Sequence, residues 1–132
     1  MIKFIELNYY CHEQENNINQ IADLHLRTSC FALRLNEICK LIIIKHAAFK
    51  KSFSFQNLQY QCFQRKNSFF QIPFKTHFYI KQQKPDVILI HGLVFPVQII
   101  ALRFLSGRKP IIMVQHHAET PFRNPVKKWL QN

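Results

Sequence analysis

Three short runs of consecutive apolar residues are spaced along this chain of 132 residues, at 41–44, 87–90 and 111–114. Each run is too short for a helix and lacks polar residues at alternate positions, which is typical of strands buried on both faces of a parallel sheet. Segments with a helical spacing of apolar residues lie between them. Because parallel strands are joined by crossover helices, this alternation predicts an α/β fold with a parallel sheet and helices on both of its faces.

Weaker signals predict further elements in the first half of the chain. A strand is expected at 2–7, and a less regular one at 55–63 follows a break at 50–52. Asn16 or Asn17 is available to cap a helix. The helix itself is predicted from apolar or small residues that recur every three or four positions: Ile21, Leu24, Thr28, Phe31, Leu35 and Ile38.

Prolines mark the helices of the second half. A helix is expected after Pro73, and Pro85 ends it. Pro96 suits the first turn of a helix that continues to Gly107. A last helix is predicted from Asn124 onward, and we expect residues 1–132 to form one domain, which is incomplete at its end.

The chain is strongly basic, with 18 Lys and Arg against 7 Asp and Glu and a formal net charge of +11. Such an excess favours an anionic partner, such as nucleic acid, an acidic membrane or a phosphorylated ligand. The basic residues are spread along the chain, and no RNA-recognition octamer or helix-turn-helix spacing accompanies them, which argues against nucleic acid. A solvated basic face and an acidic membrane surface both remain as interpretations.

Cysteine spacing and hydropathy predict the compartment. The four cysteines show no zinc-ribbon or thioredoxin spacing, and no secretory signal is recognised, so buried or half-buried free thiols in a cytoplasmic protein are expected. Residues 87–105 are apolar and long enough to span a bilayer. They contain His91, Gly92, Pro96 and Arg103, however, and a strand, a loop and a helix explain them better than a membrane span.

Several catalytic motifs are excluded. With only Gly92 and Gly107 in the chain, neither a dinucleotide-binding glycine loop nor a phosphate-binding P-loop is present. His117 and Glu119 match the start of a zinc-deaminase signature, but the Pro-Cys-x-x-Cys part is missing. His116 and His117 lack the spacing of metalloprotease ligands, so no metal site is expected. Dehydrogenase, P-loop and serine-hydrolase chemistry are therefore disfavoured.

Polar residues follow three of the predicted strands. Asn8 and Tyr10 come after the first strand, His91 and Gly92 after the strand at 87–90, and residues 116–120 after the last strand. Ligands of parallel α/β sheets bind beyond these carboxyl ends, so two histidine-bearing strand ends can line one crevice. An equally simple interpretation is that the histidines only end strands and bond to loop backbone.

The last third of the chain resembles a known enzyme family. The sequence KPDVILIHG at 84–92, an apolar helix, and PIIMVQHH at 110–117 resemble the N-terminal domain of family 4 glycosyltransferases, which are retaining enzymes with two Rossmann-like domains, the GT-B type. The resemblance extends over residues 84–131, whereas residues 1–83 match only in the order of their elements. It implies that the fold is a Rossmann-like parallel sheet corresponding to the N-terminal half of a GT-B enzyme.

The resemblance also implies site residues. His116 corresponds to the family histidine that contacts the sugar or diphosphate of the donor, and His117 replaces it if the register differs by one. Both are candidate catalytic residues. His91 and Gly92 are expected to line the cleft and Glu119 to lie near the acceptor. The remaining substrate-binding candidate is Tyr10, which begins a loop that is glycine-rich in the family but here contains two carboxylates and no glycine.

The function implied is the acceptor-side half of an enzyme that transfers a sugar from a nucleotide-sugar to a glycan or lipid-linked acceptor, without a further cofactor. The family's donor-binding domain is absent from this sequence. We therefore expect a truncated or split enzyme that is inactive alone or depends on a separate C-terminal half. The family further implies polysaccharide synthesis in the cytoplasm, with peripheral contact at the inner membrane face. The alternatives are a non-catalytic basic module that binds RNA or an anionic membrane, and a fragment with no activity.

Overall fold

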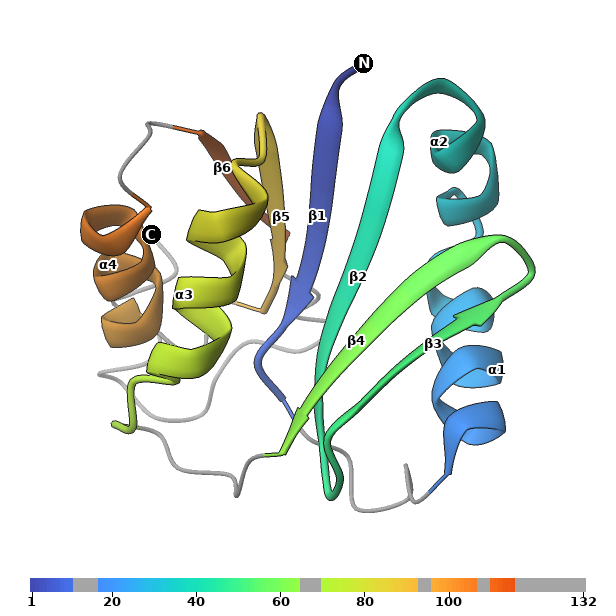
Figure 1. The fold of residues 1–132 in the computed structure, drawn as a ribbon, viewed down its shortest axis with the longest axis horizontal. Coiled ribbons are helices and arrows are strands. Elements are labelled where there is room, and N and C mark those ends of the chain that lie inside the picture. The colour runs from blue at the N-terminus through green and yellow to red at the C-terminus, as the bar shows by residue number, and fades with distance from the viewer. Residues whose placement is uncertain (11–16, 65–69, 93–95, 107–109, 116–132) are drawn as a thin grey trace, which may run out of the picture.

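A computed structural model describes residues 1–10, 17–64, 70–92, 96–106 and 110–115 (Figure 1). These residues form an α/β fold built on one six-stranded sheet with the order β3-β4-β2-β1-β5-β6. The strands are β1 (Lys3–Asn8), β2 (Lys40–Ala47), β3 (Lys51–Phe55), β4 (Leu58–Gln64), β5 (Val87–His91) and β6 (Ile111–Gln115). The helices are α1 (Ile18–Thr28), α2 (Ala32–Ile38), α3 (Phe74–Gln83) and α4 (Pro96–Leu105).

Helices cover both faces of the sheet, as predicted (Figure 1). One core cluster joins α1 and α2 to the sheet and includes Ile21, Ala32 and Ile43. The other joins α3 and α4 to the opposite face and includes Ile80 and Leu102. The three predicted apolar runs become β2, β5 and β6, and β2 is buried along almost its whole length. The alternation of apolar strands and helices therefore predicts the layers correctly.

The predicted all-parallel sheet is wrong at one edge. β1, β2, β4, β5 and β6 run parallel, but β3 pairs with β4 in the antiparallel direction, so the sheet is mixed. Residues 51 and 52 of the expected break begin β3, and the strand predicted at 55–63 contains the end of β3, the hairpin turn and most of β4. A two-residue turn joins the hairpin, and Gln56 and Asn57 both have positive φ, 48° and 65°. This backbone fits the twist of a tight hairpin, but the usual Asn-Gly or Asp-Gly signal is missing from the sequence.

The predicted long helix from 21 to 38 is also wrong, because α1 ends at Thr28 and α2 begins at Ala32. Ser29 lies in the break, where its backbone N–H donates to the carbonyl of His25. The side that α1 buries holds Ile21, Ala22 and His25. The helical spacing had placed Leu24 and Thr28 on that side.

Local end signals are confirmed at several helices. The Asn17 side chain caps α1 by accepting the N–H of Gln20 at 2.9 Å. α3 begins directly after Pro73, and α4 begins at Pro96. The helix predicted from Asn124 lies outside the described residues.

The segment that could be mistaken for a membrane span contains β5 and α4, as expected. Within the described parts of the chain, no helix is both long and apolar enough to cross a bilayer. The described cysteines, Cys30, Cys39 and Cys62, carry free thiols. Cys39 and Cys62 are buried as predicted, whereas Cys30 is exposed, and burial raises the pKa of Cys39.

Candidate functional site

The order of the strands reverses between β1 and β5, and this point defines the candidate site. From β1 the chain moves through α1 and α2 to β2 on one side, and it later returns through α3 to β5 on the other side. The crossovers lie on opposite faces of the sheet (Figure 1). The connections that follow β1 and β5 therefore leave the sheet on opposite faces, and a crevice remains between them at the carboxyl ends of the two strands. Open α/β sheets bind ligands in such a crevice.

A row of polar side chains crosses this crevice. Asn8, at the end of β1, lies opposite Lys45 on β2 and opposite His91 on β5. Because side chains alternate along a strand, Glu6 shares the face of Asn8 and lies one layer deeper. The register thus brings residues from three strands to the same end of the same face.

A pocket of about 440 Å³ opens on this row. The sheet supplies its floor, and α1, with His25, and the break after α1, with Ser29, supply a wall. Its lining residues are Glu6, Asn8, Leu24, His25, Thr28, Ser29, Ile43, Ile44, Lys45 and His91.

The Glu6 carboxylate is the buried centre of the site, with 2% of the residue exposed. Its Oε1 accepts hydrogen bonds from His91 Nε2 at 2.7 Å, from His25 Nε2 at 2.9 Å and from Ser29 Oγ at 2.9 Å. A buried charge is tolerated only when it is paired and hydrogen-bonded, and these three donors come from β5, α1 and the break after α1. Glu6 therefore links β1 to β5 and to the C-terminal end of α1.

The charge state of Glu6 decides how the protons are arranged. Burial raises the pKa of Glu6, but the hydrogen bonds and positive charge of His25 and His91 outweigh it and hold the pKa well below its ordinary value. An ionised carboxylate only accepts, so both imidazoles carry a proton on Nε2. Burial, with smaller contributions from the charges of Glu6 and Cys62, raises the pKa of Tyr60. The Tyr60 hydroxyl lies 2.9 Å from His25 Nδ1, within hydrogen-bond distance.

The second carboxylate oxygen differs from the first. Glu6 Oε2 is buried and finds no hydrogen-bond partner among the residues that the structure describes. Since three donors converge on Oε1, the carboxylate retains an acceptor for one more donor. A hydroxyl or amine group matches this acceptor chemically, while the Lys45 side chain supplies positive charge to the same pocket.

Comparison of the chain with known protein families, curated proteins and solved structures finds no match.

The sequence-predicted residues fall in three places. His91 lies in the pocket, half-buried, with its ring oriented by Glu6. Gly92 follows directly with a φ of +87°, a conformation that favours glycine, and its N–H donates to the carbonyl of Gln115 at 2.8 Å. Tyr10 is 48% exposed and does not line the pocket, and its N–H donates to Asn8 Oδ1.

His116, His117 and Glu119 lie outside the described residues. The expected proximity of the two histidine-bearing strands is confirmed up to the end of β6, because β5 and β6 are parallel neighbours and His91 lies opposite Gln115. The roles of the three residues stay predictions.

Sequence reasoning missed Glu6, His25, Ser29, Lys45 and Tyr60. A signal for Glu6 was present, since it is the only acidic residue in the predicted strand 2–7. His25 lies four residues after Ile21 and therefore belongs to the buried stripe of α1. Neither position revealed the other, because the pair is set by the packing of α1 on β1.

A second buried polar cluster lies on the opposite face of the sheet. The Tyr9 hydroxyl and His77 Nε2 are 2.9 Å apart, as are His46 Nε2 and Thr76 Oγ1. These bonds connect α3 to β2 and to the end of β1, and all four residues are buried. We interpret the cluster as structural, because its hydrogen bonds hold α3 against the sheet inside the core. Among the described residues, no group of three or more His, Cys, Asp or Glu is placed to hold a metal ion.

Proposed function

We propose that this chain is the acceptor-side domain of a GT-B glycosyltransferase, which transfers a sugar from a nucleotide-sugar to a glycan or lipid-linked acceptor. The sequences at 84–92 and 110–117 support the proposal through their resemblance to family 4 enzymes. The doubly wound α/β architecture agrees with it, since enzymes of this type bind substrates at the carboxyl ends of parallel strands.

The observation that carries the proposal is the ionised, buried Glu6 carboxylate beneath a pocket lined by His91, Lys45 and Asn8. A sugar acceptor presents hydroxyl groups that both donate and accept hydrogen bonds. In the proposed complex, one sugar hydroxyl donates a hydrogen bond to Glu6 Oε2, and Asn8 bonds to a neighbouring hydroxyl. Lys45 pairs with a phosphate of a lipid-linked acceptor, or of the donor where the two substrates meet.

The histidines have separate proposed roles. Glu6 is a positioning residue for His91, because the hydrogen bond from Nε2 to the carboxylate fixes the orientation of the ring. The family resemblance assigns contact with the donor to His116, or to His117 if the register differs, and it places Glu119 near the acceptor. In that family a second domain binds most of the nucleotide-sugar, so transfer by this chain is proposed to depend on a partner domain in the cytoplasm.

Binding of acceptor sugars tests the proposal directly, because it does not need the partner domain. The full chain, labelled with ¹⁵N, is titrated with neutral mono- and oligosaccharides, with a lipid-phosphate sugar analogue and with nucleotide-sugars. We expect saccharides to shift the amide signals of Asn8, Lys45 and His91. The matched variants are Lys45→Met in the pocket and Lys40→Met at the other end of β2, where the side chain is exposed.

The expected result is loss of phosphosugar binding in Lys45→Met with no change in Lys40→Met. If no saccharide shifts these signals, or if Lys45→Met binds as the wild type does, the proposal is wrong. Tight, sequence-selective binding of RNA at physiological salt would support the alternative of a basic RNA-binding module.

A further inference from the structure

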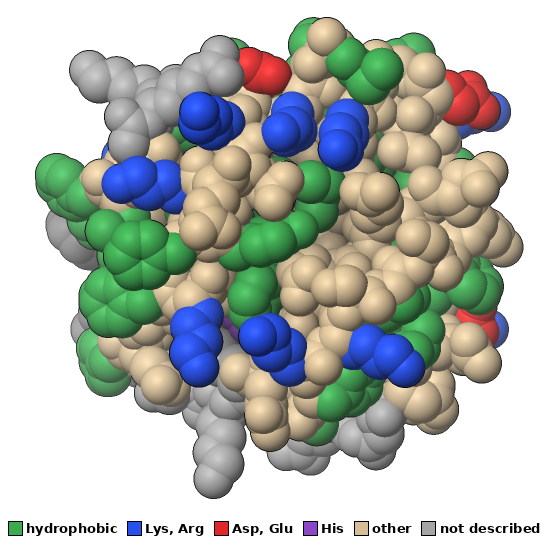
Figure 2. Space-filling view, viewed as in Figure 1, with side chains coloured by type: hydrophobic (Ala, Val, Ile, Leu, Met, Phe, Trp, Pro, Cys, Tyr) green, Lys and Arg blue, Asp and Glu red, His purple; other side chains and the backbone are tan. Residues whose placement is uncertain are grey.

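An aromatic ridge covers the outer side of α3 and α4. We define it by six exposed side chains: Phe70, Phe74, Phe78, Val97, Ile100 and Phe104. Phe104 is 82% exposed and Phe70 is 76% exposed. Figure 2 shows hydrophobic side chains gathered along the left of the view, over α3 and α4, with Lys and Arg side chains beside them. Single exposed apolar residues are ordinary, but a contiguous group on adjacent helices marks an interaction surface.

The spacing of these residues makes the ridge a regular feature of both helices. Phe74 and Phe78 are four residues apart on α3, and Val97, Ile100 and Phe104 follow the same helical period on α4. The other side of each helix is already buried in the core, with Ile80 on α3 and Leu102 on α4. The ridge therefore points away from the sheet and is not needed to close the core.

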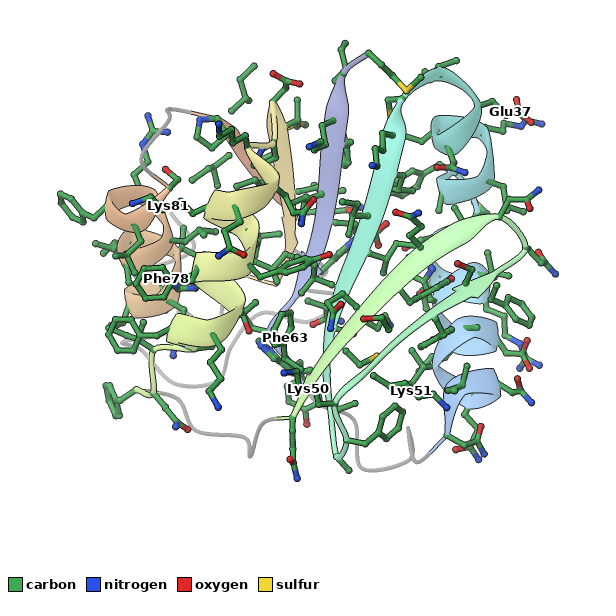
Figure 3. The ribbon with its side chains drawn as sticks, viewed as in Figure 1. Glu37, Lys50, Lys51, Phe63, Phe78 and Lys81 are labelled. Carbon is green, nitrogen blue, oxygen red and sulfur yellow. The ribbon has the colours of Figure 1, made fainter. Side chains whose placement is uncertain are left out.

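All charged side chains that α3 and α4 carry are basic. Lys75 and Lys81 lie on α3, Lys84 is its C-cap, and Arg103 lies on α4, all of them exposed. No Asp or Glu occurs in residues 70–85 or 96–106. Phe78 and Lys81, labelled in Figure 3, both come from α3, so the same helix carries an exposed phenyl group and an exposed ammonium group. A ridge of phenyl and aliphatic groups on two helices whose charged side chains are all basic complements a surface that is negative outside and apolar beneath.

We propose that the aromatic ridge binds peripherally to an anionic lipid bilayer. The phenyl and aliphatic groups enter the boundary between headgroups and acyl chains, and the lysine side chains extend their ammonium groups to the lipid phosphates. An RNA partner fits less well, because stacking needs aromatic faces and Val97 and Ile100 offer none. This inference stands on α3 and α4 alone and does not depend on the proposed sugar site, which lies on the opposite face of the sheet.

Vesicle flotation at physiological salt tests the proposal with the full chain. One set of vesicles is pure phosphatidylcholine, and the other contains equal parts of phosphatidylcholine and phosphatidylserine. We expect binding to the anionic set only. Phe74→Ser/Phe78→Ser should weaken binding about tenfold or more, since it removes two partly inserted phenyl groups. Lys75→Gln/Lys81→Gln should weaken it about 25-fold, since each basic residue near an acidic surface contributes about fivefold.

Matched control variants lie on α2 and at the starts of β2 and β3. Leu33→Ser/Ile38→Ser removes two exposed apolar groups from α2, and Lys40→Gln/Lys51→Gln removes two exposed charges. Both controls should bind as the wild type does, and circular dichroism confirms that every variant folds. The proposal is overturned if the wild type does not bind anionic vesicles, or if the control variants and the ridge variants lose binding equally. It is also overturned if the Phe variants abolish self-association or RNA binding instead.

Discussion

Replacing Glu6 by glutamine tests whether the site is held together as described. Glutamine has nearly the same shape, and its carbonyl oxygen still accepts the hydrogen bonds of His25, His91 and Ser29. The negative charge is lost, however. The new amide NH₂ also takes the position of Oε2, for which the described residues offer no partner.

The expected loss of stability follows from these contacts. A hydrogen bond to a charged group contributes about 1.5–3 kcal/mol and a neutral one about 0.5–1.5 kcal/mol, so each of the three bonds weakens by about 1 kcal/mol. We therefore expect Glu6→Gln to lower the free energy of unfolding by about 3 kcal/mol at neutral pH. Because a domain of this kind is stable by only about 5–15 kcal/mol, the change is large.

The pH dependence gives the sharper test. The pKa of Glu6 is lowered in the folded chain, so its contribution is complete above the ordinary glutamate pKa of about 4.3. As the pH falls below that value, the unfolded chain takes up a proton while the folded chain does not, and the contribution is progressively lost. The difference between wild type and Glu6→Gln should therefore shrink on acidification.

Urea unfolding followed by circular dichroism at several pH values measures this difference, and at neutral pH the midpoint should fall by about 1.5 M. The control is Glu37→Gln on α2, an exposed carboxylate labelled in Figure 3, which should change stability by less than about 0.5 kcal/mol. The reasoning is refuted if Glu6→Gln is as stable as the wild type at neutral pH, or if its deficit grows as the pH falls.

Three further substitutions test neighbouring features. Tyr60→Phe removes the hydrogen bond between the Tyr60 hydroxyl and His25 Nδ1 and should cost about 1–2 kcal/mol in urea unfolding. Because the pKa of Tyr60 is raised, wild type and Tyr60→Phe should differ in tyrosinate absorbance only at the alkaline end of a pH titration. A difference at lower pH would contradict the raised pKa. Asn17→Ala removes the N-cap of α1 and should cost about 1 kcal/mol, whereas an unchanged urea midpoint would show that the cap is not formed. Gly92→Ala meets no atom within 4 Å, so only its positive φ should oppose it, at about 1–2 kcal/mol of unfolding free energy, and a loss well beyond that would mean that the space is filled.

Much of the fold could be predicted because its signals are local. The apolar runs at 41–44, 87–90 and 111–114 predict β2, β5 and β6, since a strand without polar positions must be covered on both faces. Pro96 marks the first residue of α4, and Asn17 caps α1, because each acts through its own backbone or side chain within one turn.

The candidate site was only partly predictable. His91 and Gly92 were identified because polar residues that follow an apolar strand must lie at its carboxyl end. Glu6 and His25 were missed even though only 19 residues separate them. Their contact depends on where α1 ends and on how it crosses the sheet. The hairpin of β3 and β4 was missed because Gln56 and Asn57 adopt positive φ, and no glycine in the turn indicates this conformation in the sequence.

The amino-acid sequence alone determined the layers of this protein, because hydrophobic period and proline placement act over a few neighbouring residues. Only the tertiary structure decided that the Glu6 carboxylate meets His91, 85 residues later, and also meets the side chain of His25. Strand order and register are properties of the whole sheet, and they select one partner for each side chain from many of similar chemistry. A buried carboxylate is stable only after that selection has brought its donors together.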